Sequence, residues 1–175
     1  MMKLLNERDG LVLGICNGFQ ALVKLGLVPY GDIKELSDAD PTLTFNNIGR
    51  HQSSYVSTVV MSNNSPWLTK VNVGDIHTIP VSHGEGRFVA SHEILKDLAS
   101  KGQIATCYVD DEGVPSATTD FNPNGSDCAI EGILSPDGRV FGKMGHSERY
   151  DTDLSLNIPG SKDQKIFESG VAYFL

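Results

Sequence analysis

The apolar positions along the chain alternate between two periods, which predicts strands and helices in turn. Residues 11–15 form a nearly continuous apolar run, typical of a strand buried on both faces in a parallel sheet. The next segment, residues 18–25, has apolar side chains at helical spacing, and Gly26 follows it as a helix-ending residue. Further strands are predicted at residues 51–61, 75–81 and 104–109, and a short amphipathic helix at residues 93–101.

The last third of the chain predicts a hairpin and a returning segment. Apolar runs at residues 129–134 and 140–144 flank the turn-forming residues 136–139, as in a β-hairpin. Residues 166–175 are partly apolar and are expected to pack back on the domain. This mixture predicts a three-layer α/β fold with a mainly parallel central sheet plus antiparallel hairpins. No linker or repeat divides the chain, so residues 1–175 are predicted to form a single domain.

Composition and charge exclude several classes of function. The formal net charge is -8 and no cluster of basic residues offsets it, which argues against nucleic-acid binding. No apolar stretch approaches the roughly 20 residues of a membrane span, and the N-terminus lacks the pattern of a secretory signal. The three cysteines are widely spaced and show no zinc-site spacing, so we expect a reducing cytoplasm and no metal.

The turn between the first strand and its helix carries a thiol. Cys16 stands between Gly14 and Gly18, and the pattern resembles the nucleophile elbow of hydrolases with cysteine in place of serine. The thiol would also lie at the positive end of the following helix, where a thiolate is stabilised. A lone cysteine is commonly a small core residue, so spacing alone leaves both interpretations open. Cys107 is predicted to lie in the core and Cys128 to be structural.

A cysteine nucleophile needs a base, and the base needs a group that orients it. Among five histidines, His146 is the strongest candidate because it follows a predicted strand and Glu148 comes two residues later. In an extended segment such residues share one side, so Glu148 would hold the imidazole while its other nitrogen faces Cys16. A His-x-Glu spacing by itself is common in surface pairs. Three other histidines are expected to be surface or hydrogen-bonded residues, namely His51, His77 and His92.

Three motifs, in this order, resemble the class I (triad) glutamine amidotransferases: residues 14–20 (GICNGFQ), 82–87 (SHGEGR) and 145–149 (GHSER). More narrowly, the chain looks like the C-terminal glutaminase domain of phosphoribosylformylglycinamidine synthases, which belong to purine biosynthesis. Residues 121–126 and 135–139 also fit that subfamily. The resemblance covers nearly the whole chain, and the motifs are specific together where each alone is not.

The resemblance implies a role for each matched residue. Cys16 matches the nucleophile, His146 the general base, and Glu148 the carboxylate that orients the base. The backbone N–H of Asn17 would supply one oxyanion donor, because it follows the nucleophile. Three further residues match positions beside the glutamine substrate, namely Gln20, Ser82 and His83.

The implied reaction is hydrolysis of glutamine to glutamate and ammonia through a γ-glutamyl thioester. No cofactor is implied for this chain. The ammonia would pass to a synthetase domain, present in the same polypeptide or as a separate subunit. That domain would use ATP and Mg²⁺ to convert formylglycinamide ribonucleotide (FGAR) to the amidine (FGAM).

The chain departs from this family at its front. Class I glutaminase domains carry several strand–helix units before the nucleophile, including a loop with a second oxyanion donor, whereas fifteen residues precede Cys16 here. We therefore expect the C-terminal part of a longer polypeptide, with the first strands of the sheet missing. Loss of one oxyanion donor costs a rate factor of about 10²–10³, so the isolated chain is expected to be a poor glutaminase. The alternatives are a non-catalytic packing fragment of that enzyme and another Cys-His-Glu hydrolase on a similar fold.

Overall fold

The computed structural model describes residues 1–175 and contains two sheets and five α-helices. The strands are β1 (Val12–Ile15), β2 (Thr42–Phe45), β3 (Gln52–Val60), β4 (Ile76–His83), β5 (Glu85–Val89), β6 (Ile104–Tyr108), β7 (Ile130–Leu134) and β8 (Val140–Lys143). The helices are α1 (Met2–Glu7), α2 (Asn17–Leu25), α3 (Leu27–Tyr30), α4 (His92–Ser100) and α5 (Ile166–Ala172). Three 3-10 turns complete the structure, namely η1 (Pro66–Leu68), η2 (Asp127–Ala129) and η3 (Ser147–Arg149).

The larger sheet has six strands in the order β1-β8-β7-β6-β3-β4, and β2 pairs with β5 in a separate small sheet. The predicted α/β class is confirmed, but the balance of pairings differs from the expected mainly parallel sheet. Only β1 and β8 run parallel, with Ile15 opposite Lys143, and the other four pairings of this sheet are antiparallel. A short connection explains one of the antiparallel pairings, because the tight turn between β7 and β8 can join only antiparallel strands.

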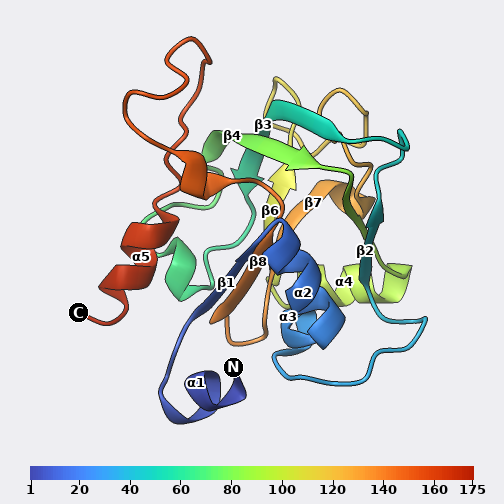
Figure 1. The fold of residues 1–175 in the computed structure, drawn as a ribbon, viewed down its shortest axis with the longest axis vertical. Helices are drawn as coiled ribbons and strands as arrows, with labels where there is room; N and C mark the ends of the chain where they lie inside the picture. The colour runs from blue at the N-terminus through green and yellow to red at the C-terminus, as the bar shows by residue number, and fades with distance from the viewer.

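Helices cover both faces of the six-stranded sheet, which gives the predicted three layers. In Figure 1, α2, α3 and α4 lie on one face, and α5 with η1 lies on the other. The larger apolar core includes Phe19, Leu22 and Leu98 and fills the space under α2 and α4. A smaller core, which includes Phe141 and Ile166, lies under α5. Side chains from the six-stranded sheet contribute to both cores, so the sheet fixes the positions of the residues at its edges.

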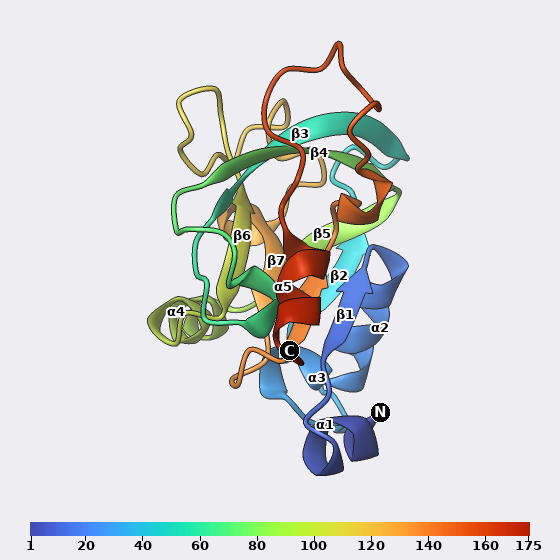
Figure 2. The ribbon, with the colours of Figure 1, turned by 90° about the vertical axis from the view of Figure 1, so that its left-hand side faces the viewer.

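The C-terminal segment packs back on the domain, as predicted. It lies against η1, where the Trp67 side chain donates a hydrogen bond to the carbonyl of Arg139 at 3.1 Å. Gly170 permits this close approach, because a Cβ there would lie 2.5 Å from the Trp67 ring. Between η3 and α5, a long loop extends away from the sheet (Figure 2). The longest helices have nine residues, and none has the length and apolar character needed to cross a membrane.

The junction between β1 and α2 depends on a close approach at Gly14. A Cβ at this position would lie 2.5 Å from a methyl carbon of Leu22 and 2.7 Å from the carbonyl group of Gly18. The absence of a side chain therefore lets α2 fold back directly on the strand that precedes it. A Cβ at Gly18 would meet no atom within 4 Å, although both glycines flank the same turn. At the far end of α2, Gly26 adopts the left-handed conformation with φ 82° and ends the helix, as predicted.

We predict opposite effects on stability for alanine at these two glycines. Gly14→Ala forces the backbone of α2 away from β1 and is expected to lower the free energy of unfolding by about 1–3 kcal/mol. Gly18→Ala, the matched control, is expected to leave stability unchanged or to raise it by up to about 1 kcal/mol, because alanine favours a helix. Denaturant unfolding of the two variants measures both effects. Equal stability of the variants would contradict the close packing at Gly14.

Candidate active site

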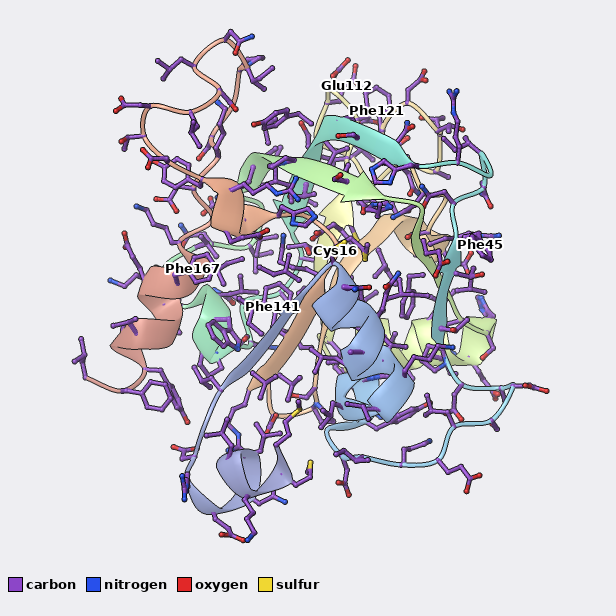
Figure 3. All side chains as sticks on the ribbon, in the orientation of Figure 1. Cys16, Phe45, Glu112, Phe121, Phe141 and Phe167 are labelled. Atoms are coloured by element: carbon purple, nitrogen blue, oxygen red, sulfur yellow. The ribbon has the colours of Figure 1, made fainter.

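Cys16 occupies the sharp turn between β1 and α2, with backbone angles φ 53° and ψ −106°. Such a conformation costs a residue with a side chain about 1–3 kcal/mol. Two hydrogen bonds hold it. The Cys16 N–H donates to the carbonyl of Lys143 at 2.8 Å, and the Cys16 carbonyl accepts from the N–H of Gln20 at 3.1 Å. Figure 3 shows the side chain at the tip of this junction. The strand, strained turn and helix have the form of a nucleophile elbow.

The surroundings of the thiol act on its charge in opposite directions. The Sγ atom is half-buried and donates to the carbonyl of Ser82 at 3.8 Å. Burial raises the pKa of the Cys16 thiol above its ordinary value, and the nearby Glu148 carboxylate adds to this. The backbone N–H of Asn17, at the start of α2, and the Arg149 guanidinium lower the pKa of the same thiol. The helix terminus thus acts in the predicted direction, but desolvation outweighs it and the free thiol is favoured.

His146 and Glu148 are in direct contact. The imidazole Nδ1 lies 2.5 Å from the carboxylate Oε1, and the His146 side chain is largely buried. The predicted contact between these two side chains is present. The backbone there is the η3 turn and not the extended segment expected from the sequence. Arg149 lies 3.5 Å from the other ring nitrogen, Nε2. Because a guanidinium can only donate, Nε2 is the accepting, basic nitrogen and Nδ1 carries the proton donated to Glu148.

Cys16 and His146 share one site without a hydrogen bond between them. The thiol contacts the carbonyl of Ser82, and the backbone N–H of His146 donates to the carbonyl of Pro80 at 2.8 Å. These two carbonyls are two residues apart on β4, a separation of about 7 Å. Because both groups are held by the same end of β4, they lie at the same end of the sheet. In this arrangement Nε2 faces Arg149 instead of the thiol.

An open pocket of about 330 Å³ lies beside the thiol. Its lining consists of Cys16, Asn17, Gln20, His51, His83, Gly84 and Glu85. The structure therefore places the predicted residues Asn17, Gln20 and His83 around one opening, and Ser82 lies just behind it through its contacts with Cys16 and His51. The side-chain amide of Gln20 donates to the carbonyl of Glu85, which leaves its oxygen as an acceptor.

His51, which the sequence predicts to be a surface or hydrogen-bonded residue, lies at this pocket. Its Nε2 is 3.1 Å from the Ser82 hydroxyl. The pairing of β3 with β4, which sets Gln52 opposite His83, carries His51 to the pocket. Only that long-range register reveals the position, so no local signal in the sequence could have found it.

His83 is a neutral, buried histidine with a defined tautomer. The Asn46 amide nitrogen donates to the carbonyls of His83 and Arg50, so the Asn46 amide oxygen must face His83 Nδ1, at 3.2 Å. Nδ1 therefore carries the proton, and Nε2 is a buried acceptor without a partner. Burial lowers the pKa of His83 to about 4, so the ring is uncharged at pH 7. Gly86 lets the ring lie on its backbone, because a Cβ there would be 2.5 Å from it.

Several other expectations are corrected. The two glycines of the motif at residues 82–87 are typical of a loop, but these residues form the end of β4 and the start of β5, because β5 pairs with β2. His77 is buried with an unpartnered Nδ1, since β4 turns it inward, and burial lowers its pKa, to which the charge of Lys143 adds. Cys107 is buried as predicted, whereas Cys128 is exposed. No group of three or more His, Cys, Asp or Glu side chains is placed to hold a metal ion.

The opposing influences on Cys16 predict how its reactivity depends on pH. The thiolate is the reactive form, so the alkylation rate by iodoacetamide should rise with pH, with a midpoint above that of an ordinary thiol. Arg149→Ala removes a charge that favours the thiolate and should raise the midpoint further. At pH 8 the reaction should slow by up to about tenfold, the effect of one pKa unit. Arg8→Ala, an exposed arginine on the N-terminal segment, is the matched control.

Mass spectrometry of the peptide that contains Cys16 separates its reaction from that of the exposed Cys128. A midpoint below that of an ordinary thiol, or equal rates for the two arginine variants, would contradict this account of the site.

Comparison with known proteins identifies the family to which the chain belongs. Residues 1–174 match the family described as the CobB/CobQ-like glutamine amidotransferase domain. Among curated relatives, phosphoribosylformylglycinamidine synthase subunit PurQ of Treponema denticola is 42% identical over 185 residues, covering 94% of this chain and 67% of the relative. The PurQ subunit of Chlorobaculum tepidum is 38% identical over 164 residues, covering 93% of this chain and 62% of the relative.

A solved structure, PurLQS from Thermotoga maritima, has a similar fold. The TM-score is 0.69 with 31% sequence identity, and the match covers 97% of this chain and 64% of the other chain. The present chain thus spans about two thirds or less of the length of these relatives. Since the family match extends over nearly every residue, the chain belongs to the CobB/CobQ-like glutamine amidotransferase domain family.

Proposed function

We propose that this chain is the glutaminase part of a phosphoribosylformylglycinamidine synthase. It hydrolyses glutamine, and the ammonia is used to convert FGAR to FGAM in purine biosynthesis. The observation that carries the proposal is the strained Cys16 elbow beside the His146–Glu148 pair, at one end of one sheet. The names of the relatives supply the pathway, since they are PurQ subunits of that synthase.

The first step is attack by the Cys16 thiolate on the amide carbon of the glutamine side chain. His146 Nε2 takes the thiol proton, a C–S bond forms, and the carbonyl electron pair moves to the oxygen. The backbone N–H of Asn17, at the start of α2, lowers the pKa of the Cys16 thiol. We assign the same N–H to the developing oxyanion, because it follows the nucleophile. Arg149 must release Nε2 for this step, because it occupies that nitrogen in the free protein.

The second step releases ammonia. The imidazolium of His146 gives its proton to the amide nitrogen, the C–N bond breaks, and the γ-glutamyl thioester remains on Cys16. Glu148 stabilises the transient imidazolium through its contact with Nδ1. A water molecule, deprotonated by Nε2, then attacks the thioester carbon, and the C–S bond breaks to give glutamate and the free thiol.

The pocket offers groups that suit the rest of the glutamine molecule. The Gln20 amide oxygen is an acceptor at the opening, because its nitrogen is committed to the carbonyl of Glu85. We assign it to the α-ammonium group of glutamine. Ser82 and His83 are assigned to the wall beside the substrate, where His83 is neutral and adds no charge.

The synthetase is the proposed partner, and ATP and Mg²⁺ would act in that partner rather than in this chain. A domain of the same polypeptide or a separate subunit would serve equally. Three free cysteines suit a reducing compartment, so we place the protein in the cytoplasm.

Labelling with 6-diazo-5-oxo-norleucine tests the nucleophile. This electrophilic glutamine analogue should modify Cys16 in the natural sequence and in Cys128→Ala, the matched control that removes an exposed thiol. Cys16→Ala should remain unlabelled, and excess glutamine should slow the reaction. His146→Ala should slow it by about 10²–10⁴, the contribution of a general base. Intact-mass and peptide-mass measurements report the outcome.

Modification of Cys128 or Cys107 in place of Cys16 would show that the assignment of the nucleophile is wrong. No labelling at all would favour the non-catalytic alternative. The purine assignment is tested separately, by conversion of FGAR with ATP and a synthetase subunit. Glutamine should support the reaction only when this chain is added, whereas ammonium salts should support it without the chain.

A further inference from the structure

A salt bridge lies buried beneath the turn that carries His146. Lys143, the last residue of β8, and Glu131 on β7 are fully shielded from solvent, and their charged groups are 3.2 Å apart. The Lys143 ammonium also donates to the carbonyl of Gly145 at 2.8 Å and to the Ser147 hydroxyl at 3.0 Å. Its three N–H groups are thus all used. Two of them end on the residues that flank His146.

The carboxylate of Glu131 completes the arrangement from the other side. One of its oxygens accepts the N–H of Gly145 at 2.5 Å, and the other accepts the hydroxyl of Thr106. Gly145 cannot carry a side chain here, because a Cβ would lie 2.9 Å from the carboxylate and 2.1 Å from Ile79. The ion pair therefore holds both polar groups of the Gly145 backbone. The backbone N–H of His146 also donates to the carbonyl of Pro80. This bond and the ion pair together restrain the backbone before and after His146.

Stability alone does not explain this pair. Desolvation of two buried charges is about as large as their attraction, and apolar residues of similar volume are often equally or more stabilising. Burial lowers the pKa of Lys143, and the adjacent Glu131 carboxylate opposes that change and favours the ammonium form. The Glu148 carboxylate also acts on Lys143, so the buried charge is felt in the His146–Glu148 pair itself.

We infer that Glu131 and Lys143 are positioning residues for the glutaminase reaction, which hold the Gly145–His146–Ser147 backbone so that the imidazole stays aligned with Glu148. Neither side chain touches the glutamine pocket, whose lining comes from α2, the segment before β3 and the β4–β5 junction. Their loss should consequently slow the chemical step and leave glutamine binding unchanged. The catalytic part of this inference rests on the proposed function, whereas the restraint of the turn does not.

The decisive variant is Glu131→Gln with Lys143→Met, which removes both charges together and leaves no unpaired buried ion. The amide introduced by Glu131→Gln can still accept from Gly145 and donate to Thr106, so the main loss is the pair of bonds from Lys143 to Gly145 and Ser147. Ile133→Val is the matched control, because this buried residue of β7 contacts the core and has no bond to the turn. Ser147→Ala is a milder variant that removes the hydroxyl, which accepts from Lys143 and donates to Gln164.

Amide hydrogen exchange provides a measurement that needs no activity. In the double variant, the amides of residues 145–147 should exchange at least about tenfold faster than in Ile133→Val, compared at equal global stability. Glutaminase kinetics provide the second measurement. The kcat should fall by about 10- to 100-fold, with KM for glutamine within about twofold of the natural sequence. In Ser147→Ala, amide exchange of residues 145–147 should be about three- to tenfold faster and kcat about three- to tenfold lower.

Each outcome decides between the explanations. A folded double variant with unchanged exchange and unchanged kcat would overturn the inference, as would a rise in KM equal to the fall in kcat. If the double variant does not fold, the same two readouts on Ser147→Ala decide. If the natural sequence does not hydrolyse glutamine even when the synthetase subunit is present, the proposed function fails. The exchange measurement still accepts or rejects the restraint of the turn.

Discussion

The parallel pairing of β1 with β8 is the constraint on which the site depends. Parallel strands end at the same edge of a sheet, and each of these two strands ends at one half of the site. Cys16 follows β1, and His146 follows β8 after a two-residue step. The pairing continues one residue beyond β1, since the Cys16 N–H donates to the carbonyl of Lys143. A single backbone ladder therefore brings together two residues that are far apart in the chain.

The electrostatics of the site follow from burial more than from helix geometry. The N-terminus of α2 points an N–H at the thiol, yet desolvation raises the pKa of Cys16. Burial also keeps His83 neutral. His146, by contrast, is in contact with the carboxylate of Glu148. Arg149 contacts Nε2 of that histidine, and the thiol and the imidazole make no hydrogen bond with each other.

Local features of the site could be predicted from sequence, and long-range features could not. The elbow depends on Gly14 and a strand-to-helix change within a few residues, and the His146–Glu148 contact spans a single turn. Both are local patterns, although the second forms in a 3-10 turn and not in an extended segment. His51 reaches the pocket only through the register of β3 on β4. Lys143 lies in an apolar strand, where no pattern indicates that its charge turns inward toward Glu131.

In the fold, too, local features could be predicted from the sequence and long-range features could not. The strand and helix positions follow from periodicity, whereas the direction of pairing depends on which strands meet. Only one pairing of the large sheet is parallel, and β1 is hydrogen-bonded to β8 alone. The strained conformation of Cys16, with a cost of about 1–3 kcal/mol, is therefore supported from one side of the strand and by the packing of α2 on Gly14. Because β8 also continues into the turn that carries His146, this one strand supports the backbone of Cys16 by hydrogen bonds and that of His146 through the chain itself.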